Sequence, residues 1–392
     1  MFFSNLNYSF YSEILFTNMI SDVHPKTPGE LFRTPIVQQT AFWSEVKAKL
    51  GNSTLALNYR TDLKGSGNLD AAAGLTESDL LITVRKTDRY HSVAYVPYGP
   101  EFEPAEEEQG RFLEELSESV RPYLPNDCIM IRYDLCWESY WAKSVENFDE
   151  NGIWLGEPAL PAREMRFNFN TINWNFRKAY QNILPSNTVF VGLKQELQTI
   201  LDNMKPKTRY NIGLALRRGV TVHTLSIDQI GVWYDLYVET AIRNNLFIHD
   251  LRYFEAVLTA KTADTNSPAV VKLLVATFEN QPLAAMFLIL SGNRGSYLYG
   301  ASSGSGRNLM APYALQWEAI RISKQMGCTE YDMFGIAPTP DPDHPMYGLY
   351  RFKTGFGGNI FHSLGCWDYP FNAGEYSYFR TAELNSQGYH HS

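Results

Sequence analysis

The chain has 392 residues, more than one hydrophobic core usually serves, so we expect two domains. Hydrophobic residues make up 44%, charged residues 19% and aromatic residues 14%, which excludes a disordered chain. The net charge of −8 argues against wrapping of nucleic acid over a broad surface, although a local basic patch could still bind RNA. The four cysteines lack C-x-x-C spacing, which is typical of reduced cytosolic thiols and indicates no metal site: Cys128, Cys136, Cys328 and Cys366.

Targeting signals are not predicted. The first 20 residues contain no Lys or Arg, and polar residues interrupt every apolar run in them. The longest apolar stretch, residues 283–290, is far shorter than the roughly 20 residues that a membrane span needs. We therefore expect a cytoplasmic protein without a transmembrane segment, whose contact with a membrane, if any, is peripheral.

The first half begins with an irregular lead-in over residues 1–35, where Pro and Gly are frequent. A helix is predicted from about Gln38, with Trp43, Val46 and Leu50 on one face and Gly51 at its end. The predicted elements that follow are strands at 79–86 and 90–97, a helix at 106–120 and a strand at 128–134.

The second half repeats this order after a connecting region. That region is predicted to hold a strand at 187–191, helices at 192–204 and 207–218, a strand at 220–224 and helix over 228–260. The repeat itself is predicted as strands at 271–278, 283–290 and 296–301, a helix at 308–326 and a strand at 330–334.

Two pairs of dipeptides mark corresponding places in the halves. Tyr98-Gly99 ends a predicted strand, and Tyr133-Asp134 ends the next predicted strand 35 residues later, after a helix. Tyr299-Gly300 also ends a predicted strand, and Tyr331-Asp332 follows 32 residues later, again after a helix. Together with the order of elements, this predicts two copies of one α/β unit, with the boundary near Pro185.

Several spaced motifs carry a family resemblance from about residue 38 to residue 366. They lie at 207–212 with 218–220, at 297–303, at 311–320, at 331–332 with 335–336, and at 348–358. In these segments the chain resembles the FemABX family of peptidoglycan peptidyltransferases, which use aminoacyl-tRNA.

The resemblance implies an α/β (α+β) fold of two tandem GNAT-like acyltransferase domains. We expect domain 1 at residues 1–185, with the tail 361–392 packing back on it, and domain 2 at 186–360. The resemblance also implies an aminoacyl-tRNA donor, no cofactor, and a UDP-MurNAc-peptide or its lipid-linked form as acceptor. No extended heptad pattern is present, so the compact form without a coiled-coil arm is the better match.

The candidate catalytic group is a lysine, because aminoacyl transfer from an ester to an amine needs no enzyme nucleophile. The acceptor amine attacks, and negative charge develops on the ester carbonyl oxygen, where a fixed cation would stabilise it. In the resembled family a Phe-Lys pair, here Phe352-Lys353, lies where the acceptor meets the tRNA end. Without the resemblance, Lys353 would be an ordinary surface lysine on a loop.

The acceptor's phosphates need basic groups in a cleft. Lys47 matches the family's phosphate-contacting lysine, the alternative being a solvated lysine on a helix. The family's second basic group is an Arg four residues before a Tyr. Tyr253 fits that tyrosine, but His249 stands at the arginine position and Arg252 lies next to Tyr253. Either the phosphate contact is weaker, Arg252 substitutes, or the acceptor differs.

Two further positions match residues that line the family's cleft. Asp134 could orient the attacking ammonium or accept its proton if burial raises its pKa, or it could be a turn-forming aspartate. Tyr299 is a ligand contact or a core residue.

A basic run is a candidate for contact with tRNA phosphates. It places five cations within 14 residues, and its alternative interpretation is a solvated helix face: Lys205, Lys207, Arg209, Arg217 and Arg218.

The sequence is also compatible with two other functions. A GNAT enzyme that uses acyl-CoA would cradle pyrophosphate in a Q/R-x-x-G-x-G/A loop. Gly304-Ser-Gly306 precedes a predicted helix at the right place, but Ala301 stands where Gln or Arg is needed. A catalytically silent scaffold of the same fold is the third possibility, and the presence of Lys353 argues against it.

Overall fold

The structure, a computed structural model, describes residues 18–65, 75–245 and 248–385. Paired strands form one continuous path through the molecule, in the order β1-β2-β3-β4-β5-β13-β7-β12-β11-β10-β9-β8, with β6 also pairing with β13. The first five strands on this path are β1 (Ile20–Lys26), β2 (Ser53–Thr61), β3 (Thr76–Lys86), β4 (Ser92–Val96) and β5 (Cys128–Glu138). The others are β6 (Arg177–Lys178), β7 (Asn187–Gly192), β8 (Thr221–Leu225), β9 (Ala269–Phe278), β10 (Gln281–Ser291), β11 (Arg294–Ser302), β12 (Glu330–Asp332) and β13 (Asn359–Pro370).

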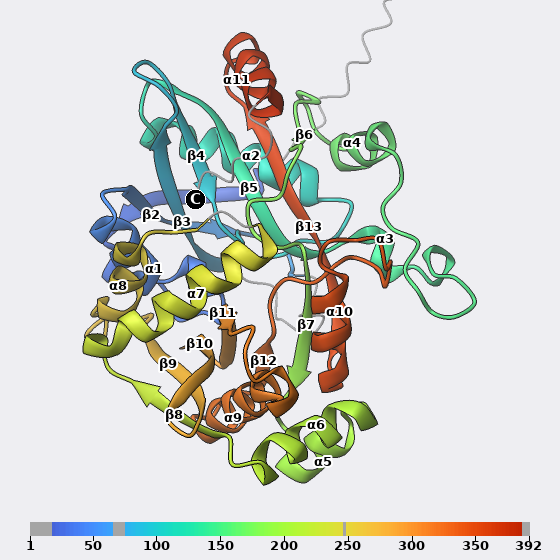
Figure 1. Ribbon diagram of the computed structural model, residues 1–392. Coiled ribbons are helices and arrows are strands. Elements are labelled where there is room, and N and C mark those ends of the chain that lie inside the picture. The colour runs from blue at the N-terminus through green and yellow to red at the C-terminus, as the bar shows by residue number, and fades with distance from the viewer. Residues whose placement is uncertain (1–17, 66–74, 246–247, 386–392) are drawn as a thin grey trace, which may run out of the picture.

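Helices cover this sheet in both halves (Figure 1). Those of the first half are α1 (Ala41–Lys49), α2 (Gln109–Val120), α3 (Tyr140–Lys143) and α4 (Leu160–Asn168). Those that follow are α5 (Leu197–Asp202), α6 (Pro206–Arg217), α7 (Ile230–Asn244), α8 (Leu251–Thr259), α9 (Ala311–Gln325), α10 (Tyr347–Lys353) and α11 (Ala373–Asn385). Within the described residues, no helix is both long and apolar enough to cross a membrane.

The same unit occurs twice. In the first half β2, β3 and β4 are antiparallel neighbours, α2 follows, and β5 returns parallel to β4. In the second half β9, β10 and β11 are antiparallel neighbours, α9 follows, and β12 returns parallel to β11. A parallel return requires a crossover connection, which each helix supplies. The predicted mixed α/β fold with a repeated unit is thereby confirmed.

Strand β13 joins the two halves. Its residues Asn359–His362 pair with β7, and Ser363–Pro370 pair with β5. Figure 1 shows β13 running between the halves toward α11. A boundary at residue 360 would therefore divide a strand that pairs with both halves, and the division into residues 1–185 and 186–360 stays a prediction.

Some predicted elements differ from the structure. The lead-in is not irregular throughout, because residues 20–26 form β1 at the edge of the sheet, where Pro25 costs no ladder hydrogen bond of a central strand. Residues 1–17 of the lead-in lie outside the described residues. The strand β2 was not predicted, since its buried face mixes apolar residues with Asn58, which hydrogen-bonds Asp79.

Two helical segments are shorter than predicted. The segment 192–204 is helical only over α5, and the segment 228–260 is two helices, α7 and α8. Asn245 ends α7 in the left-handed region, with φ of 51°, which a continuing helix does not allow. Tyr299-Gly300 lies inside β11 and Tyr133-Asp134 lies inside β5, so neither dipeptide ends its strand.

A hydrophobic cluster connects the two halves of the molecule. It contains Phe42 and Trp43 of α1 together with Trp233 of α7 and Phe254 of α8, all buried. Because α1 belongs to the first half and α7 and α8 to the second, this packing fixes the two walls of the space between them.

Candidate functional site

A cavity of about 630 Å³ lies between the halves. We call it the cationic cavity. The first half supplies α1 and the faces of β3, β4 and β5, and the second half supplies α8, β11 and the turn after β12. Four predicted acceptor residues line it: Lys47, His249, Tyr253 and Tyr299. Arg252 does not line it, because its side chain is 85% exposed and pairs with Asp250 at 2.9 Å.

The charge of this cavity comes from three elements of the first half. Side chains alternate along a strand, so Thr83 and Arg85 of β3 project from the same face, and Arg132 of β5 projects from that face on the far side of β4. Lys47 projects from α1, with Nζ 5.2 Å from the centre of the Trp43 ring. Burial, and then the neighbouring Arg85, lower the pKa of Lys47. No Asp or Glu is among the described residues that line this cavity.

The opposite wall is aromatic. The His249 ring stacks on Tyr253 with centroids 4.1 Å apart, and the Tyr253 and Tyr299 hydroxyls lie 2.6 Å apart. Burial and the nearby Lys47 lower the pKa of His249, which favours its neutral imidazole. Burial raises the pKa of Tyr253 to about 12 and that of Tyr299 well above its ordinary value. Both phenols therefore keep their protons, and one of the two protons forms the bond between the hydroxyls.

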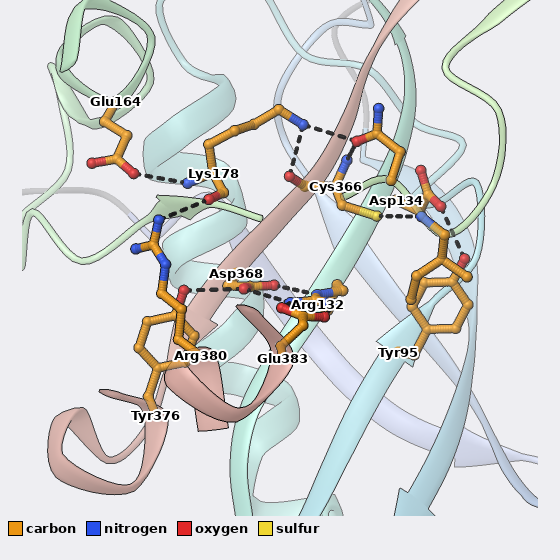
Figure 2. Close-up of polar contacts among 12 residues, drawn as sticks. Tyr95, Arg132, Asp134, Glu164, Lys178, Cys366, Asp368, Tyr376, Arg380 and Glu383 are labelled. Atoms are coloured by element: carbon orange, nitrogen blue, oxygen red, sulfur yellow. Dashed lines mark hydrogen bonds and ion pairs between the residues drawn. The ribbon is translucent and has the colours of Figure 1, made fainter. Parts of the chain in front are cut away.

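The C-terminal helix closes one side of the cationic cavity. Figure 2 shows Arg132 held between Asp368 of β13 and Glu383 of α11, with Nε–Oδ1 and Nη1–Oε1 distances of 2.6 Å each. Tyr376 of α11 also donates to Asp368, at 3.0 Å, and Phe379 lines the cavity. Sequence reasoning missed this contribution, because no motif in the tail signals it.

Asp134 lies behind the wall of the cationic cavity and does not line it. Its Oδ2 accepts from the Tyr95 hydroxyl at 2.9 Å and from the Leu184 N–H at 2.8 Å, and both of those residues line the cavity. Asp134 is fully buried, and burial raises its pKa. Its other oxygen has no hydrogen-bond partner among the described residues. The structure therefore connects Asp134 to the cavity through Tyr95.

A second cavity, of about 440 Å³, adjoins the first. We call it the acidic cavity. It shares three lining residues with the cationic cavity: Gln38, Pro185 and Phe334. Its charged residues are four carboxylates and one arginine: Glu101, Glu103, Glu330, Asp332 and Arg294. Arg294 pairs with Glu330 at 2.8 Å, and Asp332 is buried, which raises its pKa.

Phe334, on the shared wall, has an unusual backbone. Its φ of 60° is in the left-handed region, which costs a side chain of this size on the order of 1–3 kcal/mol. Its N–H donates to Asp332 Oδ1 at 2.8 Å, and its carbonyl accepts from Lys353 Nζ at 3.1 Å. Lys353 Nζ also donates to the Gly335 carbonyl at 2.8 Å. The surrounding side chains thus hold the residue at which the cavities meet.

Lys353 itself lies at the end of α10 and lines neither cavity. Its Nζ is 5.0 Å from the centre of the Tyr297 ring. Burial lowers the pKa of Lys353 to about 7, and the carboxylate of Asp332 acts in the opposite direction. Phe352 packs against Tyr313 and Phe356 in the core of the second half, with centroids 4.9 and 5.3 Å away.

The basic run is on and around α6, away from both cavities. Lys207, Arg217 and Arg218 are exposed, while Arg209 is half-buried and donates to backbone carbonyls of the α5–α6 connection. Lys205 Nζ donates to Thr354 Oγ1 at 3.4 Å, one residue after Lys353. The run therefore adjoins the segment that carries Lys353. In the part of the chain that is described, no group of three or more His, Cys, Asp and Glu residues could hold a metal ion.

Comparison with known proteins agrees with this architecture. The chain is 23% identical over 267 residues to a lipid II:glycine glycyltransferase of Staphylococcus epidermidis strain ATCC 35984, covering 54% of this chain and 64% of that protein. It is also 23% identical over 252 residues to one of Staphylococcus aureus strain USA300, covering 48% and 60%. The chain thus spans less than two thirds of the length of these relatives.

A solved structure has the same fold. The crystal structure of FemX superimposes with a TM-score of 0.68 over 92% of this chain and 100% of that one, at 17% identity. The family model described as FemAB family matches residues 35–266 and 261–384. These two segments include both copies of the repeated unit and both cavities, and the chain belongs to the FemAB family.

Proposed function

We propose that this protein transfers an amino acid from an aminoacyl-tRNA to the stem peptide of a peptidoglycan precursor, forming an interpeptide bridge or side chain. The observation that carries the proposal is the pair of cavities of opposite charge that meet at Phe334. The relatives named as lipid II:glycine glycyltransferases support this class of reaction. A cytoplasmic location, with peripheral membrane contact for a lipid-linked acceptor, belongs to the same proposal.

The acceptor binds in the cationic cavity. A precursor of either form carries phosphates, and a cavity lined by Lys47 and Arg85, with no acidic lining residue, complements that charge. The Tyr253–Tyr299 pair supplies one hydroxyl donor on the opposite wall, because the other hydroxyl proton lies between the two rings. The stem peptide then extends toward the shared wall, which brings its amine to Phe334.

The aminoacyl end of the donor enters the acidic cavity. Its free amino group is an ammonium ion at neutral pH, and a cavity lined by four carboxyl groups and one arginine favours a cation. Burial raises the pKa of Glu101, Glu103 and Asp332, and a bound ammonium would favour their ionised forms. At the shared wall the acceptor amine attacks the ester carbon, the C–N bond forms, and the ester C–O bond breaks. The amine loses a proton and the leaving ribose hydroxyl gains one. We propose that Tyr95, bonded to buried Asp134, lies on the route of that proton.

Lys353 acts as a positioning residue in this scheme. Its Nζ holds the Phe334 and Gly335 carbonyls and places a positive charge just behind the wall where the oxyanion develops. The exposed cations near α6 are proposed to contact the tRNA backbone, because Lys205 adjoins the segment of Lys353.

A reconstituted transfer assay tests the proposal. The purified protein is incubated with mixed aminoacyl-tRNAs and either the UDP-linked or the lipid-linked precursor, and product masses are measured. We expect a gain of one or more amino-acid residues that requires the tRNA. Transfer of acetyl from acetyl-CoA would instead indicate a GNAT enzyme, and precursor binding without any transfer would indicate a silent scaffold.

A further inference from the structure

The wall between the two cavities contains Pro185 as well as Phe334. Pro185 belongs to residues 182–186, which connect β6 with β7 and form neither helix nor strand. A Cβ atom on Gly335 would lie 2.9 Å from Pro185 Cγ, so the turn after Phe334 packs directly against Pro185. The position of this wall therefore depends on a segment without regular structure.

Hydrogen bonds hold the segment 182–186 at both of its ends. The Tyr98 hydroxyl donates to the Pro185 carbonyl at 2.6 Å. The Asn182 amide group joins the two ends, because its Nδ2 donates to Ser186 Oγ at 2.9 Å. Its Oδ1 accepts from the Cys366 N–H of β13 at 2.8 Å. Asn182 is thus the residue through which the segment is fixed to the sheet.

Lys178 of β6 is a buried cation behind this segment. Its side chain is 6% exposed, and its Nζ donates to Asn182 Oδ1 and to the Cys366 carbonyl, at 3.0 Å each. Figure 2 shows the amino group of Lys178 directed toward Cys366. Both acceptors are uncharged, and burial lowers the pKa of Lys178. An apolar side chain would avoid the cost of burying this amino group, which indicates a role for it beyond packing.

Lys353 of the second half is placed in the same way. It is 4% exposed, and its Nζ also donates to two uncharged oxygens beside the wall. Burial lowers the pKa of both lysines, and an aspartate of the repeated unit is among the groups that act in the opposite direction, Asp332 at Lys353 and Asp134 at Lys178. Although Lys178 belongs to β6 and Lys353 to α10, the two lysines have equivalent surroundings.

The two aspartates also hold equivalent parts of the wall. Asp134 Oδ2 accepts from the Leu184 N–H at 2.8 Å, and Asp332 Oδ1 accepts from the Phe334 N–H at 2.8 Å. Each aspartate therefore fixes the backbone of one of the two segments that meet at the wall. An aspartate and a lysine stand behind each side of it.

We propose that Lys178 is a positioning residue for the transfer, the first-half counterpart of Lys353. By holding Asn182 it keeps the segment 182–186, and with it Pro185, in place against the turn of Phe334. This inference rests on the proposed function, because the wall matters for transfer only if the two substrates meet there. Lys178 lines neither cavity, so it acts through Asn182 and not by contact with a substrate.

Three measurements on the full chain test the inference. Amide hydrogen exchange within residues 182–186 reports on the segment and requires no transfer, while single-turnover transfer and acceptor binding report on the reaction. The variant is Lys178→Met, which keeps most of the side-chain volume without Nζ. The matched control is Lys324→Met, because Lys324 Nζ also donates to a backbone carbonyl, that of Leu193 at 2.9 Å, and lines neither cavity.

We expect exchange within 182–186 to become at least about tenfold faster in Lys178→Met, because Asn182 loses the donor that holds it. Transfer should fall by roughly 10- to 100-fold, the cost of moving reacting groups by up to about 1 Å, while acceptor affinity changes by less than about threefold. Lys324→Met should stay within about threefold of wild type in every measurement. Asn182→Asp can still accept from Lys178 and from the Ser186 hydroxyl, so it should transfer at nearly the wild-type rate.

Unchanged exchange within 182–186 in Lys178→Met overturns the inference. An equal loss of transfer rate and acceptor affinity also overturns it, since general destabilisation would affect both. If Lys178→Met does not fold, Ser186→Ala replaces it, because it removes the acceptor of the Asn182 amide group, and wild-type exchange and transfer in that variant would reject the inference. If the wild type transfers nothing, the proposed function fails, and exchange alone decides whether Lys178 holds the segment.

Discussion

The two cavities differ in where their acidic residues lie. In the acidic cavity the carboxylates line the space themselves, and Arg294 is the one cation among the described lining residues. In the cationic cavity the carboxylates lie one layer back, where Asp368 and Glu383 hold Arg132 and Asp134 holds Tyr95. In a protein of net charge −8, this separation depends on which side chains face inward and not on composition.

Phe334, whose backbone conformation is costly, lies between these two differently charged cavities. It is shared by both cavities, and Asp332 on the acidic side and Lys353 behind it bond its two backbone polar groups. In the proposed function Phe334 separates two substrates of opposite charge and has to stay in place, and these hydrogen bonds offset the cost of the left-handed φ.

The largest expected effect is on the free energy of unfolding, when Arg132 is removed from the two carboxylates that hold it. Arg132→Met leaves Asp368, whose side chain is 1% exposed, without its ion pair. Loss of one partner of a buried pair costs about 3–5 kcal/mol in the free energy of unfolding. Chemical denaturation measures it, with Lys86→Met, from an exposed pair, as control. A loss below about 1 kcal/mol would show that α11 is not anchored through Arg132.

The second prediction concerns the shared wall. Lys353→Met removes the bonds to the Phe334 and Gly335 carbonyls and the charge behind them. We expect turnover to fall by about a hundredfold, the cost of misplacing reacting groups by about 1 Å, with acceptor affinity nearly unchanged. Single-turnover transfer and acceptor binding measure the two quantities.

The pH dependence separates a charge effect from a packing effect at Lys353. Its pKa of about 7 means that the charged form is lost as pH rises through neutrality. The ratio of the wild-type rate to the Lys353→Met rate should therefore fall between about pH 6 and pH 8, whichever way the attacking amine titrates. A ratio independent of pH would leave Lys353 with a packing role only.

The third prediction concerns Asp332 of the acidic cavity. It concerns the pH midpoint at which the ratio of wild-type to Lys353→Met rates has fallen halfway. Asp332 opposes the lowering of the Lys353 pKa, so Asp332→Asn should move the midpoint of the rate ratio to lower pH. A move of one pH unit would reduce the charged fraction at pH 7 from about half to about a tenth. Asparagine can still accept from the Phe334 N–H. An unchanged midpoint would mean that the two side chains are not coupled.

The smallest effect is expected at the aromatic wall. Tyr299→Phe removes one hydroxyl of the 2.6 Å pair with Tyr253, which costs about 0.5–1.5 kcal/mol in the free energy of unfolding. Tyr210→Phe, an exposed tyrosine of α6, serves as control. If acceptor affinity falls while stability does not, the Tyr299 hydroxyl contacts the acceptor and contributes little to the stability of the core.

Most of the fold could be predicted from the sequence. The alternation and apolar runs of β3, β9 and β10 and the periodicity of α9 are local signals, and the order of elements revealed the repeat. The strands β1 and β2 were missed because polar residues occupy positions that only pairing explains, as at Asn58, whose amide finds Asp79 of β3.

The candidate site, like the fold, was predicted only in part. The family resemblance pointed to Lys47, Tyr253, Tyr299 and Lys353, and the structure places the first three around one cavity and the fourth behind its wall. The tertiary structure alone separated Arg252 from the site, brought in Arg85 and Arg132, and placed Asp134 behind Tyr95. The physical reason is that a charge acts through distance and burial, and these depend on how strands far apart in the sequence pair, as β5 does with β13.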